Sequence, residues 1–412
     1  MEKKLFKVKK ICRLCKSKDL KLSFDLGPNP IGDDYTKKKN KAKLIPLKIM
    51  ACLNCGFKQL SVVVNEKKVY GNYLYTTSTS KGLTEHFKKS YNFLRKKIRL
   101  NKKDLIVDIG SNDGIKLNIF KKKGHSVLGV EPAKYLCKIS EKKKIPTING
   151  FFDNLCVKKI ISRHGYPKLV CVYNMMANVD NLDKFINDLK KLMGTKTVVA
   201  IESFSLAGII KKNLFDNIYH EHLSYFHIRP LIKFFKKFGI QIFYAKNNDI
   251  KGGSIIFYLR LMSDKSKNNN ITKCLQYEKK LNLNSSNVFN KIKKKNKINL
   301  IKISRFIKKL NNKKIVGFGA SVGSTVFIHY FKLNDKLKIL LDDEKRRNNL
   351  FSPSTNIKVY NPKSHLLKKV DVVLIIAWRY KDNIVSNFKK KYPKIFKKQK
   401  WFTLIPDIKK IN

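Results

Sequence analysis

The chain has 412 residues, of which 43% are hydrophobic, and its 90 Lys and Arg against 29 Asp and Glu give a formal net charge of +61. This length predicts two to three domains of about 150 residues each, and the apolar content excludes a disordered chain. The longest apolar runs, such as residues 370–378, are shorter than the ~20 residues of a membrane span, and no signal peptide is evident. Eight cysteines are too few for a disulfide scaffold, so we expect a cytoplasmic protein.

The lysines are scattered along the chain in short runs, such as Lys37–Lys39, Lys121–Lys123 and Lys293–Lys295. A protein that binds nucleic acid or a membrane surface gathers its cations in one tail or one helix face, often with interleaved aromatic residues. We therefore expect neither nucleic acid nor a membrane as a partner. We interpret the surplus of lysine mainly as the compositional drift of an AT-rich genome at tolerant surface positions, with a modest contribution to the binding of an anionic substrate.

Two Cys-x-x-Cys pairs lie within the first 70 residues, which are otherwise rich in turn-forming residues. The four cysteines are Cys12, Cys15, Cys52 and Cys55. Two such turns complete tetrahedral coordination of Zn²⁺, and four thiolates leave no open position for water. The pattern predicts a structural zinc-binding domain over residues 1–70, with a redox pair or unrelated buried cysteines as the alternative.

From residue 71 the chain alternates between apolar runs typical of buried strands and amphipathic segments typical of helices. The expected strands are 105–109, 126–130, 169–173, 197–201 and 252–261. The expected helices are 83–98, 116–122, 133–142 and 182–192. This alternation predicts an α/β fold with a doubly wound parallel sheet over residues 71–265.

A second α/β unit is expected near the C-terminus. Residues 266–310 are polar and lysine-rich with apolar positions at helical spacing, which predicts a helical linker. A strand, turn and helix at 314–330, followed by strands at 338–341 and 370–377, then predict a Rossmann-like domain over residues 311–412.

The strand at 105–109 runs into a glycine-rich turn ahead of a helix, and the next strand ends in the carboxylate of Glu131. Dinucleotide-binding proteins share this arrangement, because the glycines let the backbone approach a ligand and the carboxylate grips a ribose diol. The G-x-G-x-x-G fingerprint is absent. The turn instead resembles the first motif of class I methyltransferases, whose cofactor is S-adenosylmethionine (SAM). The resulting candidate cofactor site is Asp108, Gly110, Asn112, Gly114, Glu131 and Asn174, with a plain strand-to-helix turn as the alternative.

The segment 215–226 concentrates two His, one Glu and two Tyr. A neutral histidine beside a carboxylate is typical of a general base, and a tyrosine hydroxyl can stabilise an oxyanion. A metal site using His220 and His222, or a purely structural polar cluster, remains an alternative.

These motifs resemble those of the sugar C-methyltransferases that act on nucleotide-linked 4-keto-deoxysugars. The resemblance follows the order of the chain through the two Cys pairs, Tyr75, Glu85-His86-Phe87, Asp108–Gly114, Tyr219–Phe226, Gly252–Ser254, Gly317–Ala320, Leu341–Asp343 and Ala377-Trp378. It implies that a base removes the proton at C3 of the sugar, which the C4 ketone acidifies, and that the enolate takes the methyl group of SAM.

The resemblance also implies roles for individual residues. His222 is the expected base, Glu221 its partner or a partner of the sugar, and Tyr219 and Tyr75 are expected to hold sugar oxygens. His220 and Asn178 are expected to complete the substrate pocket, although Asn178 stands where the family often has a histidine.

The C-terminal unit contains a G-x-G-x-x-x-G turn, from Gly317 to Gly323, and Asp342-Asp343 ends its next strand. Alone, this pattern predicts a second dinucleotide site. The resemblance implies instead a sugar-nucleotide subsite without a redox cofactor, formed by Gly319, Ser321 and Trp378. Gly323 occupies a position that is usually basic, and a turn kept only for packing remains an alternative.

The sequence therefore predicts three modules and a SAM-dependent C-methyltransferase, a monomer or homodimer, that acts on a nucleotide-diphosphate 4-keto-deoxysugar. Two alternatives stay open. One is a nucleic-acid methyltransferase, which the charge and the zinc knuckles favour. The other is a non-catalytic homologue that binds SAM or a nucleotide sugar, which the departure at Asn178 favours.

Overall fold

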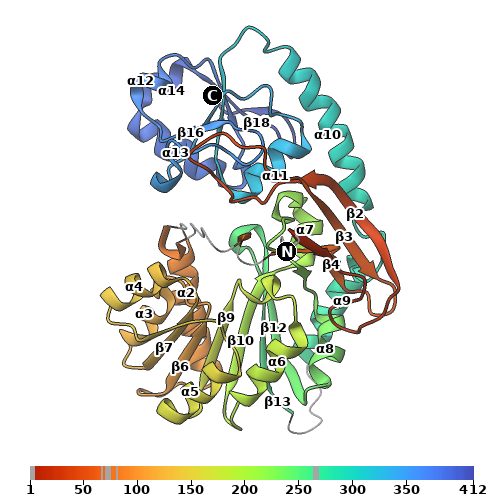
Figure 1. The fold of residues 1–412 in the computed structure, drawn as a ribbon, viewed down its shortest axis with the longest axis vertical. Helices are drawn as coiled ribbons and strands as arrows, with labels where there is room; N and C mark the ends of the chain where they lie inside the picture. The colour runs from red at the N-terminus through yellow and green to blue at the C-terminus, as the bar shows by residue number, and fades with distance from the viewer. Residues whose placement is uncertain (1–4, 66–67, 70–75, 80–81, 263–268) are drawn as a thin grey trace.

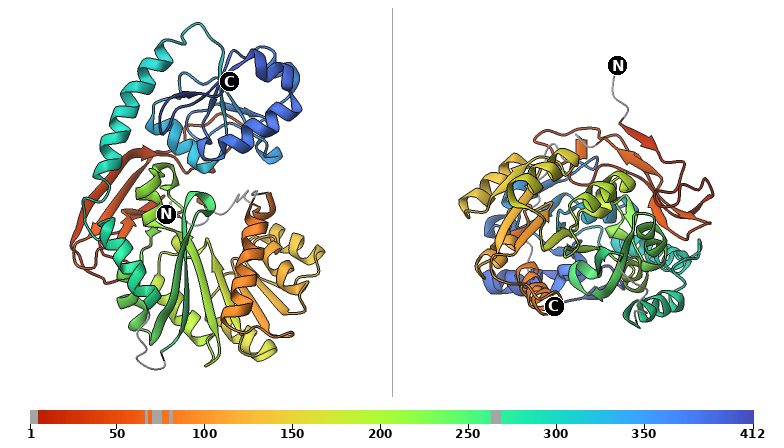
Figure 2. Two further views of the ribbon diagram at one scale, coloured as in Figure 1. Left: turned by 180° about the vertical axis from the view of Figure 1, so that it is seen from behind. Right: turned by 90° about the horizontal axis from the view of Figure 1, so that it is seen from below.

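The computed structural model describes residues 5–65, 68–69, 76–79, 82–262 and 269–412. Two α/β lobes lie one above the other, and a small β-rich N-terminal module flanks both on one side (Figure 1). Seen from behind, the long helix α10 (Asn290–Lys308) runs beside that module along the outer edge and leads from the lower lobe to the upper one (Figure 2). Among the described residues, no helix is long and apolar enough to cross a membrane.

The N-terminal module contains a four-stranded antiparallel sheet in the order β11-β4-β3-β2 and a two-stranded sheet, β1-β5. Its strands are β1 (Phe6–Val8), β2 (Leu20–Asn29), β3 (Ile45–Cys52), β4 (Lys58–Leu60), β5 (Val62–Val64) and β11 (Ser224–Tyr225). In β3 every second side chain is fully buried from Ile45 to Ala51, as the two-residue period of a one-sided strand requires. The edge strand β11 comes from the middle of the chain, more than 150 residues after β4.

The central domain is built on a seven-stranded sheet in the order β12-β13-β10-β9-β6-β7-β8. Its strands are β6 (Leu105–Ile109), β7 (Ser126–Glu131), β8 (Thr147–Asn149), β9 (Leu169–Tyr173), β10 (Val198–Phe204), β12 (Ile240–Asn248) and β13 (Ser254–Leu261). Strand β13 runs antiparallel to both of its neighbours, β12 and β10, and the other pairs of neighbouring strands in this sheet are parallel. The strands β9 and β10 are buried along their whole length, because a doubly wound sheet is covered on both faces.

Helices cover the central sheet on both faces, as Figures 1 and 2 show. They are α2 (Leu83–Lys97), α3 (Ile115–Lys121), α4 (Lys134–Lys142), α5 (Asn154–His164), α6 (Leu182–Lys191), α7 (Leu206–Lys212) and α8 (Ile228–Lys236). The predicted strands at 105–109 and 169–173 coincide with β6 and β9, and the predicted helices lie within two residues of the observed ones. The doubly wound α/β fold is thus confirmed.

The C-terminal domain has a six-stranded sheet in the order β16-β15-β14-β17-β18-β19, parallel except for β19. Its strands are β14 (Ile315–Phe318), β15 (Ile339–Leu341), β16 (Lys358–Tyr360), β17 (Val372–Ile375), β18 (Lys400–Thr403) and β19 (Lys409–Lys410). Its helices are α11 (Val322–Tyr330), α12 (Ser364–Leu367), α13 (Lys381–Lys391) and α14 (Pro393–Lys398). The second Rossmann-like unit is therefore present.

The segment predicted as a linker divides into two helices with different partners. Helix α9 (Asn269–Lys280) packs on β12 and α8 of the central domain, and Glu278 accepts hydrogen bonds from the first two backbone N–H groups of α8. Only α10 crosses to the C-terminal domain (Figure 2). The domain boundaries drawn from the sequence stay a prediction.

The N-terminal module also contacts the C-terminal domain. Thr36 and Phe351 exchange two backbone hydrogen bonds, of 3.1 and 2.7 Å. The Thr325 hydroxyl donates to the Gly32 carbonyl at 2.9 Å, and the Arg347 guanidinium pairs with Asp33 at 2.7 Å. Because the same module carries β11, it contacts both α/β domains.

Candidate functional site

A cavity of about 1600 Å³ lies between the central and C-terminal domains, and its wall includes residues of all three modules. The carboxyl ends of β6, β7 and β9 line one end, and the turns after β14 and β15 line the other. Ligands of open α/β sheets bind at the carboxyl ends of the strands, so both sheets direct their binding edge toward this space.

The turn after β6 has the backbone conformation that a close ligand approach requires. Gly110, Asn112 and Gly114 all have positive φ, at 74°, 52° and 70°. The Glu131 carboxylate accepts the backbone N–H groups of Asn112 and Ala133, each at 2.9 Å. Burial raises the pKa of Glu131, and these two N–H donors oppose that rise. The carboxylate therefore fixes the turn and keeps lone pairs for a ligand.

Two asparagine side chains on the cavity wall have buried oxygens without a hydrogen-bond partner among the described residues. They are Asn174, directly after β9, and Asn178, in the short helix η2 (Met176–Asn178). Buried polar atoms are nearly always hydrogen-bonded, so an unpaired oxygen on a cavity wall indicates a ligand group. The structure thus brings Asp108, Gly110, Asn112, Glu131 and Asn174 together on one cavity wall, and Gly114 completes the turn.

A buried ion pair that the sequence analysis missed supports this turn. Lys116, on α3, places its Nζ 2.6 Å from Asp108 Oδ1 and 3.7 Å from the ring centroid of Tyr173. Burial raises the pKa of Asp108, and the ammonium of Lys116 acts against that rise. A lysine eight residues after an aspartate across a strand-to-helix turn is the local signal that could have found this pair.

Removal of Lys116 is expected to destabilise the protein strongly. Lys116→Met leaves the Asp108 carboxylate buried without its cation, which costs about 3–5 kcal/mol of unfolding free energy. Denaturant unfolding measures the loss, and the exposed Lys122→Met is the matched control, with an expected change within about 0.5 kcal/mol. An equal, small effect of both variants would contradict the importance of the pair.

His222 stands on the cavity wall between two aromatic rings. Its ring centroid lies 3.9 Å from that of Tyr219 and 4.1 Å from that of Phe204. Its Nδ1 lies 2.8 Å from the carbonyl oxygen of Asn217, which can only accept, so Nδ1 carries the proton. Burial lowers the pKa of His222 to about 3, so the ring is neutral at physiological pH and Nε2 holds a free lone pair.

Glu221, next to His222, is also buried and lines the same cavity. Its Oε2 has no hydrogen-bond partner in the described part of the chain. Burial raises the pKa of Glu221 to about 7, with a smaller contribution from the negative charge of Asp33. The carboxyl group can therefore act as a hydrogen-bond donor at neutral pH.

Other residues predicted for the site lie elsewhere. His220 is buried outside the cavity lining, with Nε2 3.4 Å from the Pro46 carbonyl oxygen of β3. Trp378 donates its indole N–H to Asp216 at 3.1 Å and does not line the cavity. Gly319 and Ser321 do line it, whereas Tyr75 falls outside the described residues.

Arg379, which the sequence analysis did not select, occupies the junction between the two α/β domains. Its guanidinium bonds to the Asn217 side-chain oxygen and pairs with Asp216 at 3.4 Å, and it lines the cavity. A Cβ at Gly323 would lie 2.8 Å from the Asp216 carbonyl oxygen and 3.0 Å from Nη2 of Arg379. The glycine at this usually basic position thus leaves room for the guanidinium of Arg379.

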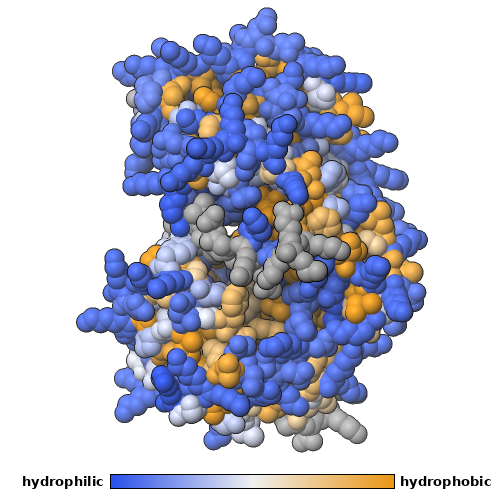
Figure 3. Space-filling view, in the orientation of Figure 1, coloured by the Kyte–Doolittle hydropathy of each residue, from blue (hydrophilic) through white to orange (hydrophobic). Residues whose placement is uncertain are grey.

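The cavity wall is acidic although the chain is strongly basic. Among the described lining residues, ten are Asp or Glu and six are Lys or Arg. Four of those six cations already pair with a carboxylate: Lys116, Lys184, Arg347 and Arg379. The scattered lysines instead belong to the outer surface, and hydrophilic residues spread over both lobes in Figure 3.

The four predicted zinc ligands come together at one end of the N-terminal module. All four Sγ atoms lie within 4.8 Å of one another, with Cys12 to Cys55 at 3.7 Å and Cys15 to Cys52 at 3.5 Å. Tetrahedral Zn²⁺ with Zn–S bonds of about 2.3 Å needs sulfur atoms about 3.8 Å apart. The cluster therefore fits a structural zinc ion.

Comparisons with known proteins match each of the three modules in order. Residues 12–70 match a family described as "Putative zinc binding domain", residues 82–244 a "Methyltransferase domain", and residues 249–406 a "C-methyltransferase C-terminal domain". The C-methyltransferase NovU of Streptomyces niveus is 24% identical over 385 residues, which cover 92% of both chains.

Two similar solved structures each align with less than half of the chain. A Pyrococcus horikoshii protein aligns over 48% of this chain and all of its own, with 10% identity and a TM-score of 0.36. A SAM-dependent methyltransferase from Anabaena variabilis aligns over 42% of this chain and 84% of its own, with 12% identity and a TM-score of 0.35.

The fold, the turn after β6 and the cysteine cluster define a class I SAM-dependent methyltransferase with an N-terminal zinc-binding module. Within that class, the matched C-terminal domain and the relative that covers nearly the whole chain show that it is a C-methyltransferase.

Proposed function

We propose that the chain transfers the methyl group of SAM to the carbon beside the ketone of a nucleotide-diphosphate 4-keto-deoxysugar. The observation that carries this proposal is the neutral His222, whose Nδ1–H is held by a backbone carbonyl and whose Nε2 is left as a proton acceptor on the cavity wall. A ketone acidifies the neighbouring C–H, and a positioned base of this kind contributes about 10²–10⁴-fold to the rate.

In this proposal Nε2 of His222 takes the proton, and the electron pair moves to the ketone oxygen to form an enolate. Protonated Glu221 and the Tyr219 hydroxyl donate to the sugar oxygens and stabilise the developing charge. Glu131 and Asn174 would hold SAM, which would supply an electrophilic methyl group to the enolate carbon; its sulfur–methyl bond would break and S-adenosylhomocysteine would leave. Tyr75, outside the described residues, stays a predicted partner of the sugar.

The nucleotide end of the substrate is assigned to the C-terminal domain. The turn after β14 presents Gly319 and Ser321, and Lys345 lies on the same wall without an ion pair among the described residues. A single diphosphate needs few donors, and the start of α11 supplies backbone N–H groups. A long polyanion such as RNA fits poorly against a wall that carries ten acidic side chains.

Labelled-methyl SAM tests the acceptor class directly. We expect label in nucleotide-linked 4-keto-deoxysugars, bound to carbon by NMR, and none in nucleotide sugars without a ketone. Label in RNA or DNA would support a nucleic-acid methyltransferase. Binding of SAM without label in any acceptor would support a non-catalytic homologue. A cytoplasmic location and a monomeric or homodimeric state belong to the same proposal.

The pH dependence of kcat/KM should follow the titration of Glu221 and not that of His222. With a pKa of about 3, His222 stays neutral as the pH falls through 6.5, so no loss of kcat/KM is expected there. Glu221 loses its proton as the pH rises through about 7, so kcat/KM is expected to fall above that pH. Glu221→Gln keeps a donor and removes the titration, and its profile should be flat. An unchanged alkaline fall in Glu221→Gln would contradict this assignment.

A further inference from the structure

The segment that follows His222 belongs to the sheet of the zinc-binding module. Strand β11 pairs antiparallel with β4, with Ser224 opposite Gln59 and Tyr225 opposite Lys58. One residue earlier, the Leu223 carbonyl accepts the Leu60 N–H at 3.0 Å. The backbone directly after His222 is therefore held by the N-terminal module, although the residue lines a cavity of the α/β domains.

Gln59 joins that sheet to the first zinc knuckle. Its side chain is fully buried; its Oε1 accepts the backbone N–H of Arg13 at 2.7 Å, and its Nε2 donates to the Ile11 carbonyl at 2.9 Å. Ile11 and Arg13 flank the zinc ligand Cys12. Gln59 thus fixes the position of the first zinc knuckle relative to β4, the strand that pairs with β11.

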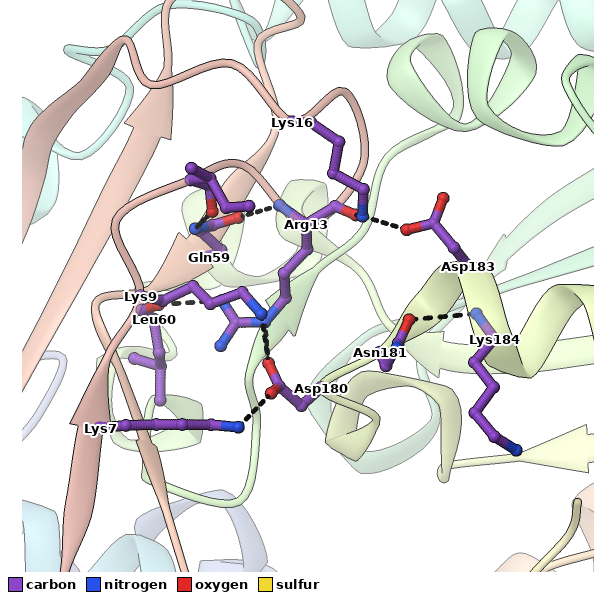
Figure 4. Close-up of polar contacts among 11 residues, drawn as sticks. Lys7, Lys9, Arg13, Lys16, Gln59, Leu60, Asp180, Asn181, Asp183 and Lys184 are labelled. Carbon is purple, nitrogen blue, oxygen red and sulfur yellow. Dashed lines mark hydrogen bonds and ion pairs between the residues drawn. The ribbon is translucent and has the colours of Figure 1, made fainter. Parts of the chain in front are cut away.

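The buried side chain of Arg13 links the same sheet to the cavity wall (Figure 4). Its Nη1 donates to the Leu60 carbonyl at 3.0 Å, and its Nε lies 3.5 Å from Oδ1 of Asp180, which lines the cavity. Lys7 and Lys9 also pair with Asp180, at 3.1 and 2.9 Å. Three cations of the module therefore converge on one carboxylate of the central domain.

These contacts form a closed ring around the residue after the base. Leu223 donates its N–H to the Ala177 carbonyl at 2.8 Å and accepts from Leu60. Ala177 precedes Asp180 in the same loop, and Arg13 contacts both Asp180 and Leu60. One covalent segment, residues 177–180, and four polar links thus fix one end of the His222 segment against the cavity wall.

We infer that the zinc-binding module positions the base, and that Arg13 is the positioning residue that transmits the geometry of the knuckle to His222. This inference rests on the proposed role of His222. A shift of about 1 Å in a reacting group can lower the rate about 100-fold. The buried contacts of Arg13 can therefore affect turnover through the position of His222, although Arg13 does not contact the substrate.

The test compares Arg13→Met with Lys16→Met in the full-length zinc-loaded protein. Both residues lie at the first knuckle and face the central domain, but Lys16 pairs with Asp183, which does not line the cavity, and its contact with Arg13 is to the backbone carbonyl, at 2.9 Å. Arg13→Met is expected to keep stoichiometric zinc and to bind S-adenosylhomocysteine as wild type does. It is expected to lower kcat about 10–100-fold, with a smaller change in KM. Amide hydrogen exchange in residues 219–226 should become faster. Arg13→Lys should recover part of the loss, and Lys16→Met should match wild type.

Wild-type kcat and amide exchange in Arg13→Met would overturn the inference. If Arg13→Met loses zinc, Gln59→Met tests the link from the other side, and zinc-loaded Gln59→Met with wild-type exchange in residues 219–226 would also overturn it. The exchange measurement needs no acceptor. If the wild-type protein methylates no 4-keto sugar, the proposed function is wrong. The role of Arg13 in positioning His222 would then be decided by amide exchange alone.

Discussion

His222→Ala and His222→Gln are expected to lower kcat about 10²–10⁴-fold, because either change removes the imidazole whose Nε2 is the proposed proton acceptor on the cavity wall. Binding of S-adenosylhomocysteine should change little, since the cofactor wall is formed around Glu131 and Asn174. Initial rates with a 4-keto sugar acceptor and calorimetric binding measure the two quantities separately.

The neighbouring histidine provides a matched control. His220 lies two residues away, is equally buried, and contacts β3 instead of the cavity. His220→Gln, checked for normal folding, should keep kcat within a few fold of wild type. A larger loss in His220→Gln than in His222→Gln would show that the base had been assigned to the wrong histidine.

Loss of zinc is expected to unfold the N-terminal module and abolish turnover. Binding of structural zinc contributes about 10–16 kcal/mol to folding in zinc-finger peptides, far more than the two Gln59 hydrogen bonds that also hold the first knuckle. Cys52→Ser, or treatment with a strong chelator, should therefore release the metal, lower the Tm and disorder the strand pairing between β4 and β11.

Cys274→Ser separates this effect from a general sensitivity to cysteine replacement. Cys274 lies on α9, far in sequence from the cluster, and its thiol donates a hydrogen bond to the Ala245 carbonyl at 3.6 Å. The zinc content, Tm and turnover of Cys274→Ser should resemble those of wild type. A metal-free protein with an unchanged Tm and full activity would show that the cluster holds no structural zinc.

The features that sequence analysis predicted well are local in the chain. The turn from Gly110 to Gly114 and the carboxylate of Glu131 belong to one strand–turn–helix–strand unit, so hydrophobic pattern and spacing identify them. The cysteine pairs are equally local, because a Cys-x-x-Cys turn fixes two ligands without tertiary information. The assembled cluster confirms the spacing argument.

The features that it missed depend on contacts between distant segments. Nothing near Tyr225 shows that its strand completes a sheet with residues 58–60, because a two-residue strand has no period to detect. His220 and His222 are two residues apart and would point to the same side of an extended strand. The sequence pattern therefore cannot tell which of them faces the cavity, and only tertiary packing decides it. The acidic lining was hidden because the net charge of a chain says nothing about how its carboxylates are distributed.

Solvent exchange at the acceptor tests the central claim most directly. Nucleotide 4-keto-deoxysugars are incubated with the enzyme and S-adenosylhomocysteine in deuterated buffer, so that the base can act without methyl transfer, and the sugar is analysed by mass spectrometry. We predict incorporation of one deuterium at the carbon beside the ketone by wild type and a loss of that incorporation in His222→Gln. Equal incorporation by both proteins, or none by a wild type that does methylate the sugar carbon with SAM, would contradict base catalysis by His222.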